Sequence, residues 1–484
     1  MRASAGAPGD VVFGLDVGTS GVKGLALDPG GRVLLAAEAT YELSTPRPGW
    51  AEQDPEDWWE AASAVLARLQ AEAGRPAGIG LSGQMHGLVA LDAAGRVLRP
   101  AILWNDQRTG AECQEIEARI GLTRLIELTG NRALPGFTAP KMLWMRAHEP
   151  ELYARIARIA LPKDYVRLRL CGEHATDVAD ASGTLLLDVA ERRWSAEVLD
   201  ALALPPEWLP PALESPQVSG LTAEGTPVAA GAGDQAAGAL GAGVDRAGGV
   251  ASVVVGTSGV VFAALSRYAA DPQGRVHAFC HAVPGTWHAM GVMLSAAGSL
   301  AWLQRILGAG YELLTAEASD WGPTAEGLLF LPYLAGERTP HADPDARGAF
   351  TGLGLRHDRG ALVRAVLEGV AFGLRDSLDL VSELGESPTV GRVSGGGAHS
   401  EEWLRIIASV LELPLQRVAV EDAAAFGAAL LGGVAAGVWP DVPSAVAATV
   451  RPGEVIEPVA EWIEPYRAAR ERFIALYPAL RACR

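Results

Sequence analysis

Cysteine and positive charge are both scarce in this chain of 484 residues. Its four cysteines lie far apart and form no Cys-x-x-Cys pair, so we expect free thiols in a cytoplasmic protein and neither a disulfide framework nor a cysteine-bound metal. Lys and Arg number 40 against 57 Asp and Glu, and the net charge of −17 disfavours a protein that binds nucleic acid through its overall charge. Any phosphate group must then be held by backbone N–H groups, a metal ion and one or two well-placed cations.

Long apolar runs are missing as well. Residues 247–266 and 423–439 carry no charge, but the first stretch is interrupted by Gly-Thr-Ser-Gly and the second is short for a bilayer and rich in Gly and Ala. Residues 1–10 are small and polar and lack the apolar segment of a secretory signal. We therefore expect both stretches to be buried elements and the chain to have no membrane span.

Several segments have clear local patterns. The apolar runs at 11–17, 22–27 and 33–37 alternate with Gly-containing turns, which predicts three antiparallel strands joined by tight hairpins. Asp54 and Pro55 are a typical N-cap and first residue, so a helix is expected over 54–70. A short buried strand is expected at 78–82, and helices at 111–120 and 140–146.

An internal repeat indicates two similar domains. Val17–Val22 reads Val-Gly-Thr-Ser-Gly-Val and recurs as Val255–Val260, each time between two apolar, strand-like runs. The length and the 49% of apolar residues also suit two cores. Repeats this far apart predict two related domains and not a solenoid. We place the boundary near 243–248, which divides the chain into 1–244 and 245–484.

The two copies differ in their charges. Asp16 precedes the first turn and Lys23 follows it, whereas Val254 and Val261 take these places in the second copy. A Gly-Thr-Ser-Gly turn can offer N–H groups and hydroxyls to a phosphate, although a single such turn is usually a plain hairpin. Two copies suggest a clamp on a polyphosphate, with Asp16 holding Mg²⁺ through water. Lys23 could contact a phosphate or simply cap the hairpin.

Two further glycine-rich segments could carry chemistry. Asp234 lies within Gly231–Gly238 and could be a helix N-cap, an acceptor of a substrate proton, or both. Gly395–Gly397 follow an expected strand and precede a helix that starts near Ser400, so a flat ligand could lie against them, unless they form a flexible loop. There is no Gly-x-x-x-x-Gly-Lys-Ser/Thr motif and no dinucleotide-binding fingerprint, which disfavours a P-loop enzyme.

In order and spacing, these segments resemble the FGGY carbohydrate kinases, a family of the actin/hexokinase/Hsp70-like ATPase superfamily. Both family signatures have counterparts, at Phe137–Trp144 and Gly348–Glu368, and the resemblance covers roughly residues 11–440. It implies two duplicated, ribonuclease H-like α/β domains that flank a cleft. The first would bind the sugar and the second ATP, and the cleft would close around them.

Within the family, Gln84–Gly87, Pro100–Asp106 and Leu161–Tyr165 resemble the xylulokinases; glycerol kinases have Arg-Glu in place of Met85-His86. Gly336–His341 resembles them too, without an assignable role. The resemblance implies ATP-dependent phosphorylation of D-xylulose to D-xylulose 5-phosphate in xylose metabolism. The alternatives are a kinase for another ketose, a polyol or glycerol, and, more remotely, a non-enzymatic actin-like ATPase.

Residue roles are carried over by position. The resemblance implies that Asp234 is the general base on the terminal sugar hydroxyl and that Asp16 supports Mg²⁺. The implied sugar contacts, besides Asp234, are Gln84, Met85, His86, Trp104, Asn105 and Asp106. The implied ATP contacts are Thr19, Ser20, Lys23, Gly256, Thr257, Gly395, Gly396, Gly397 and Ser400. Gln235 stands where many relatives have Asn. Relatives are often dimers, so a homodimer is expected.

Overall fold

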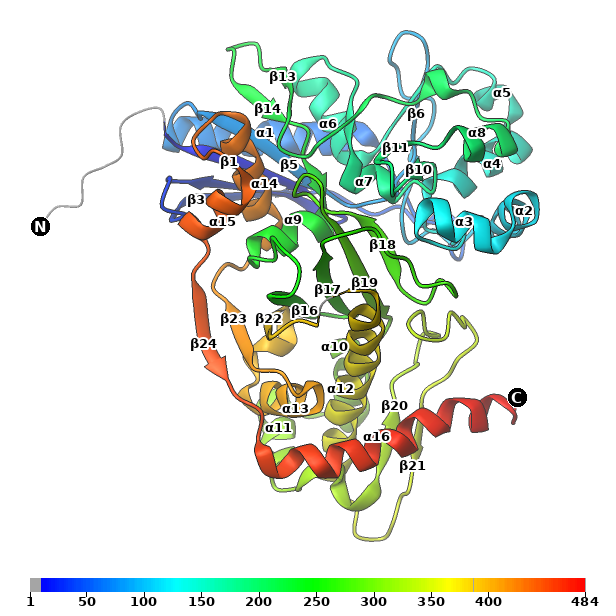
Figure 1. Cartoon of the computed structure of the whole chain (residues 1–484), viewed down its shortest axis with the longest axis vertical. Helices are drawn as coiled ribbons and strands as arrows, with labels where there is room; N and C mark the ends of the chain where they lie inside the picture. Colours follow the sequence, from blue (N-terminus) through cyan, green and yellow to red (C-terminus); the bar gives the residue numbers. More distant parts are fainter. Residues whose placement is uncertain (1–9, 386, 484) are drawn as a thin grey trace, which may run out of the picture.

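The computed structural model describes residues 10–385 and 387–483, which form two α/β units one above the other (Figure 1). Each unit is built on a seven-stranded mixed sheet with helices packed on it. This confirms the fold class that the sequence predicts. The division at 244/245 itself stays a prediction, because the chain crosses between the two sheets again later.

The first sheet contains the three hairpin strands expected from the sequence. Its order is β13 (Val218–Leu221), β14 (Pro227–Ala229), β5 (Gly78–Gly83), β1 (Val12–Val17), β2 (Gly21–Leu27) and β3 (Val33–Thr40), with β15 (Ala232–Gly233) beside β5. β1, β2 and β3 are antiparallel neighbours, whereas β5 runs parallel to β1. The ends of β1, β5 and β15 therefore meet at one edge of the sheet.

The second sheet repeats this arrangement. Its order is β18 (His277–Cys280), β19 (Trp287–Met293), β17 (Gly259–Leu265), β16 (Val250–Val255), β22 (Val390–Ser394), β23 (Leu415–Val418) and β24 (Pro452–Ile456). β16 and β17 form the antiparallel hairpin around the second Gly-Thr-Ser-Gly turn, and β22 runs parallel to β16 as β5 does to β1. In both units the parallel strand leads into a functional candidate, Gln84 after β5 and Gly395 after β22.

Helices cover both faces of the first sheet. α1 (Pro55–Ala73) packs on β2 and β3, and the Asp54 carboxylate accepts a hydrogen bond from the Glu56 N–H, so the expected N-cap is confirmed. In β1, Phe13 and Leu15 share a core with α1, while Gly14 faces the opposite side. This alternation follows from the two-residue period of a strand.

A helix from late in the chain covers that opposite side. α14 (Ala423–Ala435) packs on β1, β5 and α9 (Asp234–Gly241), and in Figure 1 it lies beside the β1–β3 strands of the first unit. A Cβ added to Gly14 would lie 1.9 Å from the Ala425 carbonyl oxygen, and one added to Gly80 would lie 1.8 Å from that of Ala428. The backbones thus touch, which only glycine permits here. The charge-free stretch 423–439 is a buried element, as predicted.

Long helices also pack on the second sheet. α12 (Arg359–Leu384) covers β17 and β19, and α13 (Glu401–Leu411) lies between α12 and the C-terminal α16 (Ala460–Arg481). The other helices are α2 (Gly110–Ile120), α3 (Leu122–Thr129), α4 (Thr138–His148), α5 (Pro150–Tyr153), α6 (Pro162–Cys171), α7 (Val178–Ser182), α8 (Ala196–Leu202), α10 (Ala297–Leu307), α11 (Tyr311–Ser319) and α15 (Val442–Thr449). Short 3₁₀ helices are η1 (Pro206–Trp208), η2 (Pro323–Gly327) and η3 (Gly396–His399).

Short strand pairs complete the fold. They are formed by β4 (Glu52–Gln53), β6 (Val89–Leu91), β7 (Ala101–Ile102), β8 (Arg158–Ala160), β9 (Thr176–Asp177), β10 (Leu187–Asp188), β11 (Arg193–Trp194), β12 (Ala212–Leu213), β20 (Leu329–Leu331) and β21 (Ala349–Thr351). All four cysteines are free, as predicted. Within 10–385 and 387–483, no helix combines the length and the apolar character needed to cross a bilayer.

Candidate active site

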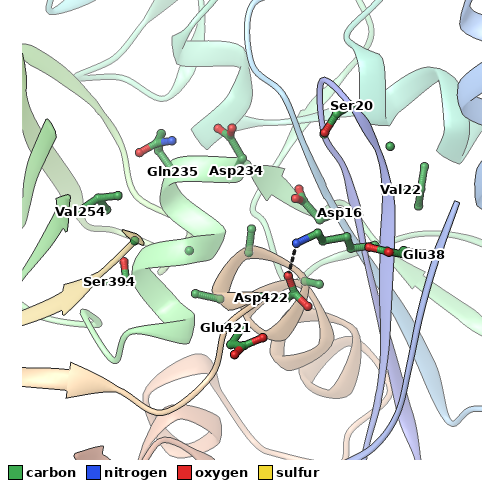
Figure 2. A pocket seen from close by; sticks show the side chains of 18 of the residues that line it. Asp16, Ser20, Val22, Glu38, Asp234, Gln235, Val254, Ser394, Glu421 and Asp422 are labelled. Carbon is green, nitrogen blue, oxygen red and sulfur yellow. Dashed lines mark hydrogen bonds and ion pairs between the residues drawn. The ribbon is translucent and has the colours of Figure 1, made fainter. Parts of the chain in front are cut away.

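A cavity of about 400 Å³ lies between the two units, as a cleft between duplicated domains requires. Residues from β1, β2, β3 and α9 line one side, residues from β16, β17 and β22 line the other, and the start of α14 lines the floor in Figure 2. Its wall includes Asp16, Ser20, Asp234, Gly395 and Asp422. The cavity thus brings together the first turn, the Gly231–Gly238 segment and the start of the Gly395–Gly397 segment.

Asp234 begins helix α9 directly after β15. The N-cap residue is Gly233, so interpreting Asp234 as the N-cap is wrong by one position; Asp234 is the first residue of the helix. Burial first, and then the negative charge of Asp16, raise the pKa of Asp234 to about 7. A carboxylate with such a pKa can accept a proton near neutral pH far better than an ordinary aspartate. In Figure 2 its side chain lies at the cavity, near Asp16.

Asp16 lies near the end of β1, opposite Ser82 of the parallel strand β5. The Ser82 hydroxyl donates to Asp16 Oδ1 at 2.7 Å. Burial raises the pKa of Asp16, and the Ser82 hydrogen bond opposes this shift. Two partly buried carboxylates, Asp16 and Asp234, thus line one cavity, and the negative charge of Asp16 acts on Asp234. Hard oxygen ligands with uncompensated negative charge are what Mg²⁺ prefers, so these residues fit that ion.

Lys23 has a partner that sequence reasoning did not consider. Its Nζ lies 2.6 Å from Asp422 Oδ1, which ties β2 to the residue preceding α14 (Figure 2). The Lys23 side chain remains about half exposed at the cavity wall. Contact between Lys23 and a phosphate stays a prediction.

The two hydroxyl-bearing residues of the first Gly-Thr-Ser-Gly turn, Thr19 and Ser20, have different surroundings. The Thr19 hydroxyl accepts a hydrogen bond from Trp104 Nε1 at 3.0 Å and donates one to Gln84 Oε1 at 3.3 Å. Ser20, by contrast, lines the cavity between the units. Thr19 was predicted as an ATP contact, but its hydroxyl lies among the predicted sugar contacts. Gln53, which sequence reasoning missed, supports this corner by donating to the Thr19 carbonyl oxygen and accepting from Gln84 Nε2.

Met85 and His86 form the turn after β5. Met85 lies against Gly233, where an added Cβ would be 2.6 Å from Met85 Cγ, so this turn adjoins Asp234. His86 Nδ1 donates to the Gly183 carbonyl oxygen at 2.6 Å, because a carbonyl can only accept. Nε2 is then the unprotonated acceptor. Burial lowers the pKa of His86 to about 3, so the ring stays neutral at physiological pH.

The three side chains of Trp104–Asp106 have different environments. The Trp104 side chain is 42% exposed and donates to Thr19. Asn105 Oδ1 is buried and has no hydrogen-bond partner within the described residues, as expected of a group that a ligand satisfies. Asp106 is fully buried, and its carboxylate accepts from the backbone N–H groups of Ala51 and Arg108 and pairs with the Arg108 guanidinium. Asp106 therefore fixes this loop, and its oxygens are already occupied.

The second turn and the three glycines lie in the other unit. The carbonyl oxygens of Gly256 and Thr257 accept hydrogen bonds from backbone N–H groups at the start of α10. Gly395 lines the cavity between the units, whereas Gly396, Gly397 and Ser400 line a second cavity of about 930 Å³. The glycine segment thus lies between two cavities, as a segment that binds an extended nucleotide would. The Ser400 hydroxyl accepts from the Trp403 N–H as the N-cap of α13.

Comparisons with known proteins match both units. Residues 11–241 match the model for the FGGY family of carbohydrate kinases, N-terminal domain, and residues 251–436 match that for the C-terminal domain. The chain belongs to the FGGY family of carbohydrate kinases. It is a sugar kinase.

Individual relatives cover almost the whole of this FGGY kinase. The xylulose kinase of Escherichia coli (strain K12) is 43% identical over 97% of this chain and 99% of its own length. The solved structure of xylulose kinase from Rhodospirillum rubrum has a TM-score of 0.92 at 35% identity and covers 98% of this chain and 99% of that chain. Gluconate kinase from Lactobacillus acidophilus has a TM-score of 0.91 at 25% identity, over 97% and 98%.

A buried cluster of charges in the FGGY kinase lies behind the sugar-side turns. Lys163 Nζ lies 2.5 Å from Asp164 Oδ1, 2.7 Å from Asp177 Oδ2 and 3.1 Å from Asp180 Oδ2. The three carboxylates are close enough together to hold a metal ion, but the ammonium of Lys163 already lies among them. We therefore interpret them as an ion network. Sequence reasoning noted Leu161–Tyr165 but missed Asp177 and Asp180, which no motif connects to Lys163.

The ion network contacts the backbone next to two candidate site residues, Gln84 and Asp234. The Lys163 side chain lies against Gly83 and Gly231, where added Cβ atoms would be 3.1 Å and 3.6 Å from it. Asp177 caps α7, whose C-cap residue, Gly183, binds His86 through its carbonyl. The buried Lys163 side chain therefore contacts the backbone just before Gln84 and the backbone just before Asp234. Through Asp177 it is also linked to α7, which ends at Gly183, the residue that binds His86.

Proposed function

We propose that this FGGY kinase transfers the γ-phosphoryl group of ATP to the terminal hydroxyl of D-xylulose, giving D-xylulose 5-phosphate, with Asp234 as the general base. The observation that carries the proposal is the partly buried Asp234 carboxylate, whose pKa is raised to about 7, at a cavity flanked by both units and next to the Met85-His86 turn. The similarity to xylulose kinases over nearly the full chain supports the choice of sugar.

In this mechanism Asp234 accepts the proton of the attacking hydroxyl as the oxygen approaches the γ-phosphorus. Phosphoryl transfer passes through a loose transition state, so the protein mainly positions the reactants and offsets charge. The low-polarity surroundings that raise the pKa of Asp234 also strengthen its hydrogen bond to the hydroxyl. The bond between the γ-phosphorus and the bridging oxygen of ATP breaks, so ADP is the leaving group. The proton stays on the Asp234 carboxyl group and is released to solvent after both products depart.

The sugar would lie along the wall formed by Met85, His86, Trp104 and Asn105. His86 Nε2 can accept from a sugar hydroxyl, because Nδ1 is already committed to Gly183 as a donor. The hydrogen bonds from Trp104 to the Thr19 hydroxyl and from that hydroxyl to Gln84 support one edge of this wall. A ring of short-range donors and acceptors of this kind suits a small polyhydroxy ligand.

ATP would extend from the cavity between the units to the second cavity, past Gly395–Gly397. Its phosphates would lie near Ser20 and the two turns, and its adenosine near Gly396, Gly397 and Ser400. Mg²⁺, held by Asp16, would offset the phosphate charge that the acidic chain otherwise repels. Each unit carries one part of the reactants, so closure of the cleft would exclude water as a competing acceptor. We also expect a cytoplasmic homodimer, which size-exclusion chromatography with light scattering tests.

A substrate panel tests the choice of sugar. Purified protein with Mg²⁺ and ATP is assayed by coupled ADP detection against D-xylulose, D-ribulose, D-fructose, xylitol, gluconate and glycerol. We expect the highest kcat/KM with D-xylulose and a product phosphorylated at O5, which ³¹P NMR identifies. A tenfold preference for another acceptor would overturn the assignment of the sugar but leave the kinase mechanism in place. The gluconate kinase of the same fold makes gluconate the most informative competitor.

A further inference from the structure

The backbone of His86 adopts a conformation that has to be held in place. Its φ is +69°, in the left-handed region that residues with a side chain seldom occupy. Such backbone persists only where neighbouring groups over-determine it. The contacts of His86 that could do so come from α7, through Gly183, and from the start of α4.

Lys141 in α4 is the central contact. Its Nζ donates to the His86 carbonyl oxygen at 2.8 Å and to the Gly136 carbonyl oxygen at 2.6 Å. The Thr138 hydroxyl donates to the same His86 oxygen at 3.0 Å. Gly136 in turn lies against Trp104, where an added Cβ would be 2.6 Å from the Trp104 carbonyl oxygen. Lys141 therefore joins the two strips of backbone that carry His86 and Trp104.

Burying a lysine at this position costs desolvation free energy. Its side chain is completely buried and forms no ion pair with any described carboxylate; the ammonium is held by backbone carbonyl dipoles. Burial lowers the pKa of Lys141 to about 7, with the negative charge of Asp106 acting in the opposite direction. An apolar side chain would avoid this desolvation cost if the position needed only packing. An apolar side chain, however, could not donate hydrogen bonds to the carbonyl oxygens of His86 and Gly136.

We propose that Lys141, assisted by Thr138, is a positioning residue that holds the His86 carbonyl, and with it the His86 imidazole and the Trp104 loop, in the geometry that binds the sugar. It does not touch the reacting atoms, because its donors are directed at protein carbonyls. The proposal rests on the proposed function for the identity of the ligand. It gives a physical role to the lysine of the Phe137–Trp144 segment, which the mechanism above does not use.

The test compares Lys141→Met with Leu143→Ala in the full-length protein. Met keeps the length of the side chain but removes the donors. Leu143 lies in the same helix and is 1% exposed, and its removal leaves the His86 carbonyl contacts in place. We expect both variants to lower the melting temperature. Only Lys141→Met should raise the KM for D-xylulose, at least tenfold, while the KM for ATP stays within twofold of wild type.

A further variant covers the case that Lys141→Met does not fold. Thr138→Val removes the other donor to the His86 carbonyl oxygen at almost constant volume, and we expect a two- to fivefold rise in the KM for D-xylulose. A wild-type sugar KM in folded Lys141→Met, or in Thr138→Val, would overturn the proposal. An equal rise in Leu143→Ala would overturn it too, because general loosening would then explain the effect.

The wild-type assay separates this result from the proposed function. If wild type phosphorylates none of the sugars in the panel, the proposed function fails first. If wild type is active and the variants keep its sugar KM, only the positioning role of Lys141 fails.

Discussion

At the scale of single residues, the proposed chemistry depends on two carboxylates with different roles. Asp234 begins α9 and has a raised pKa, whereas Asp16 accepts a hydrogen bond from Ser82 near the end of β1. Both could be found from the sequence because each stands beside glycines in a short motif. Their mutual influence could not, since it depends on how close β1 and β15 end.

Replacing Asp234 by Asn should abolish proton acceptance and leave the pocket shape unchanged. A general base contributes about 10²–10⁴-fold, so kcat should fall by about that factor or more. Sugar binding, measured by isothermal titration calorimetry, should stay within a few-fold of wild type. The neighbouring Gln235→Asn is the matched control, because it also lies at the cavity but keeps an amide; it should retain most of the activity. Turnover near wild type in Asp234→Asn would remove Asp234 from its role.

The pH profile should show the same residue. The base must be deprotonated, and the pKa of Asp234 is raised to about 7, so kcat/KM should fall about tenfold per pH unit below that value. Part of that shift comes from the negative charge of Asp16. Asp16→Asn removes this charge, which lowers the pKa of Asp234 and should move the acid limb to lower pH. It should also weaken the dependence on Mg²⁺. An acid limb that stays in place or moves upward in Asp16→Asn would contradict the coupling.

At the scale of elements, the buried charge cluster around Lys163 packs against the backbone segments that carry the candidate site. Lys163 and Arg167 face the three carboxyl groups of Asp164, Asp177 and Asp180, so with all five groups ionised the cluster would carry one more negative than positive charge. Burial raises the pKa of Asp180 well above its usual value. Loss of the lysine would leave buried carboxylates unpaired, whereas loss of one carboxylate would balance the cluster.

Two substitutions in this cluster should therefore differ in their effect on stability. Lys163→Met should lower the free energy of unfolding by about 3–5 kcal/mol, the usual cost of breaking a buried ion pair on one side. Asp180→Asn should cost less, because two cations then face two carboxylates. Urea denaturation followed by circular dichroism measures both. An equal loss in the two variants would mean that packing, and not charge, holds this region.

What the sequence predicted among these elements was local. The hairpins β1–β3, the α1 cap and the start of α13 at Ser400 follow from alternation and capping residues within a few positions. The network of Lys163 with Asp177 and Asp180 could not be predicted, because it depends on helices α6 and α7 meeting in space. Asp106 was predicted as a sugar contact from its position in the motif alone. Its oxygens bind the Ala51 N–H and Arg108, and the contact with Ala51 depends on the tertiary structure.

At the scale of the whole molecule, the two units should bind different reactants. Gly396 has no atom within 4 Å of an added Cβ and borders the second cavity, so Gly396→Val should project into the space expected for adenosine. We expect the KM for ATP to rise about tenfold or more, as for the loss of about 1.4 kcal/mol of binding, and the sugar KM to stay unchanged. Initial-rate kinetics with each substrate varied in turn measure both.

Gly395→Ala is the contrasting control for that prediction. Its φ is +88° and an added Cβ would lie 2.7 Å from the Val255 carbonyl oxygen, so this variant should lose stability as well as activity. A rise in the sugar KM in Gly396→Val, with the KM for ATP unchanged, would contradict the division of labour between the units.

The packing of α14 makes the two halves of the polypeptide dependent on each other. Gly14 and Gly80 expose bare backbone that α14, from the other half, has to cover. A protein fragment ending near residue 244 would leave that glycine-lined surface open to water, and the remaining fragment would carry an apolar helix with nothing to pack on. Each should aggregate when expressed alone, and co-expression of the two should recover soluble, active enzyme.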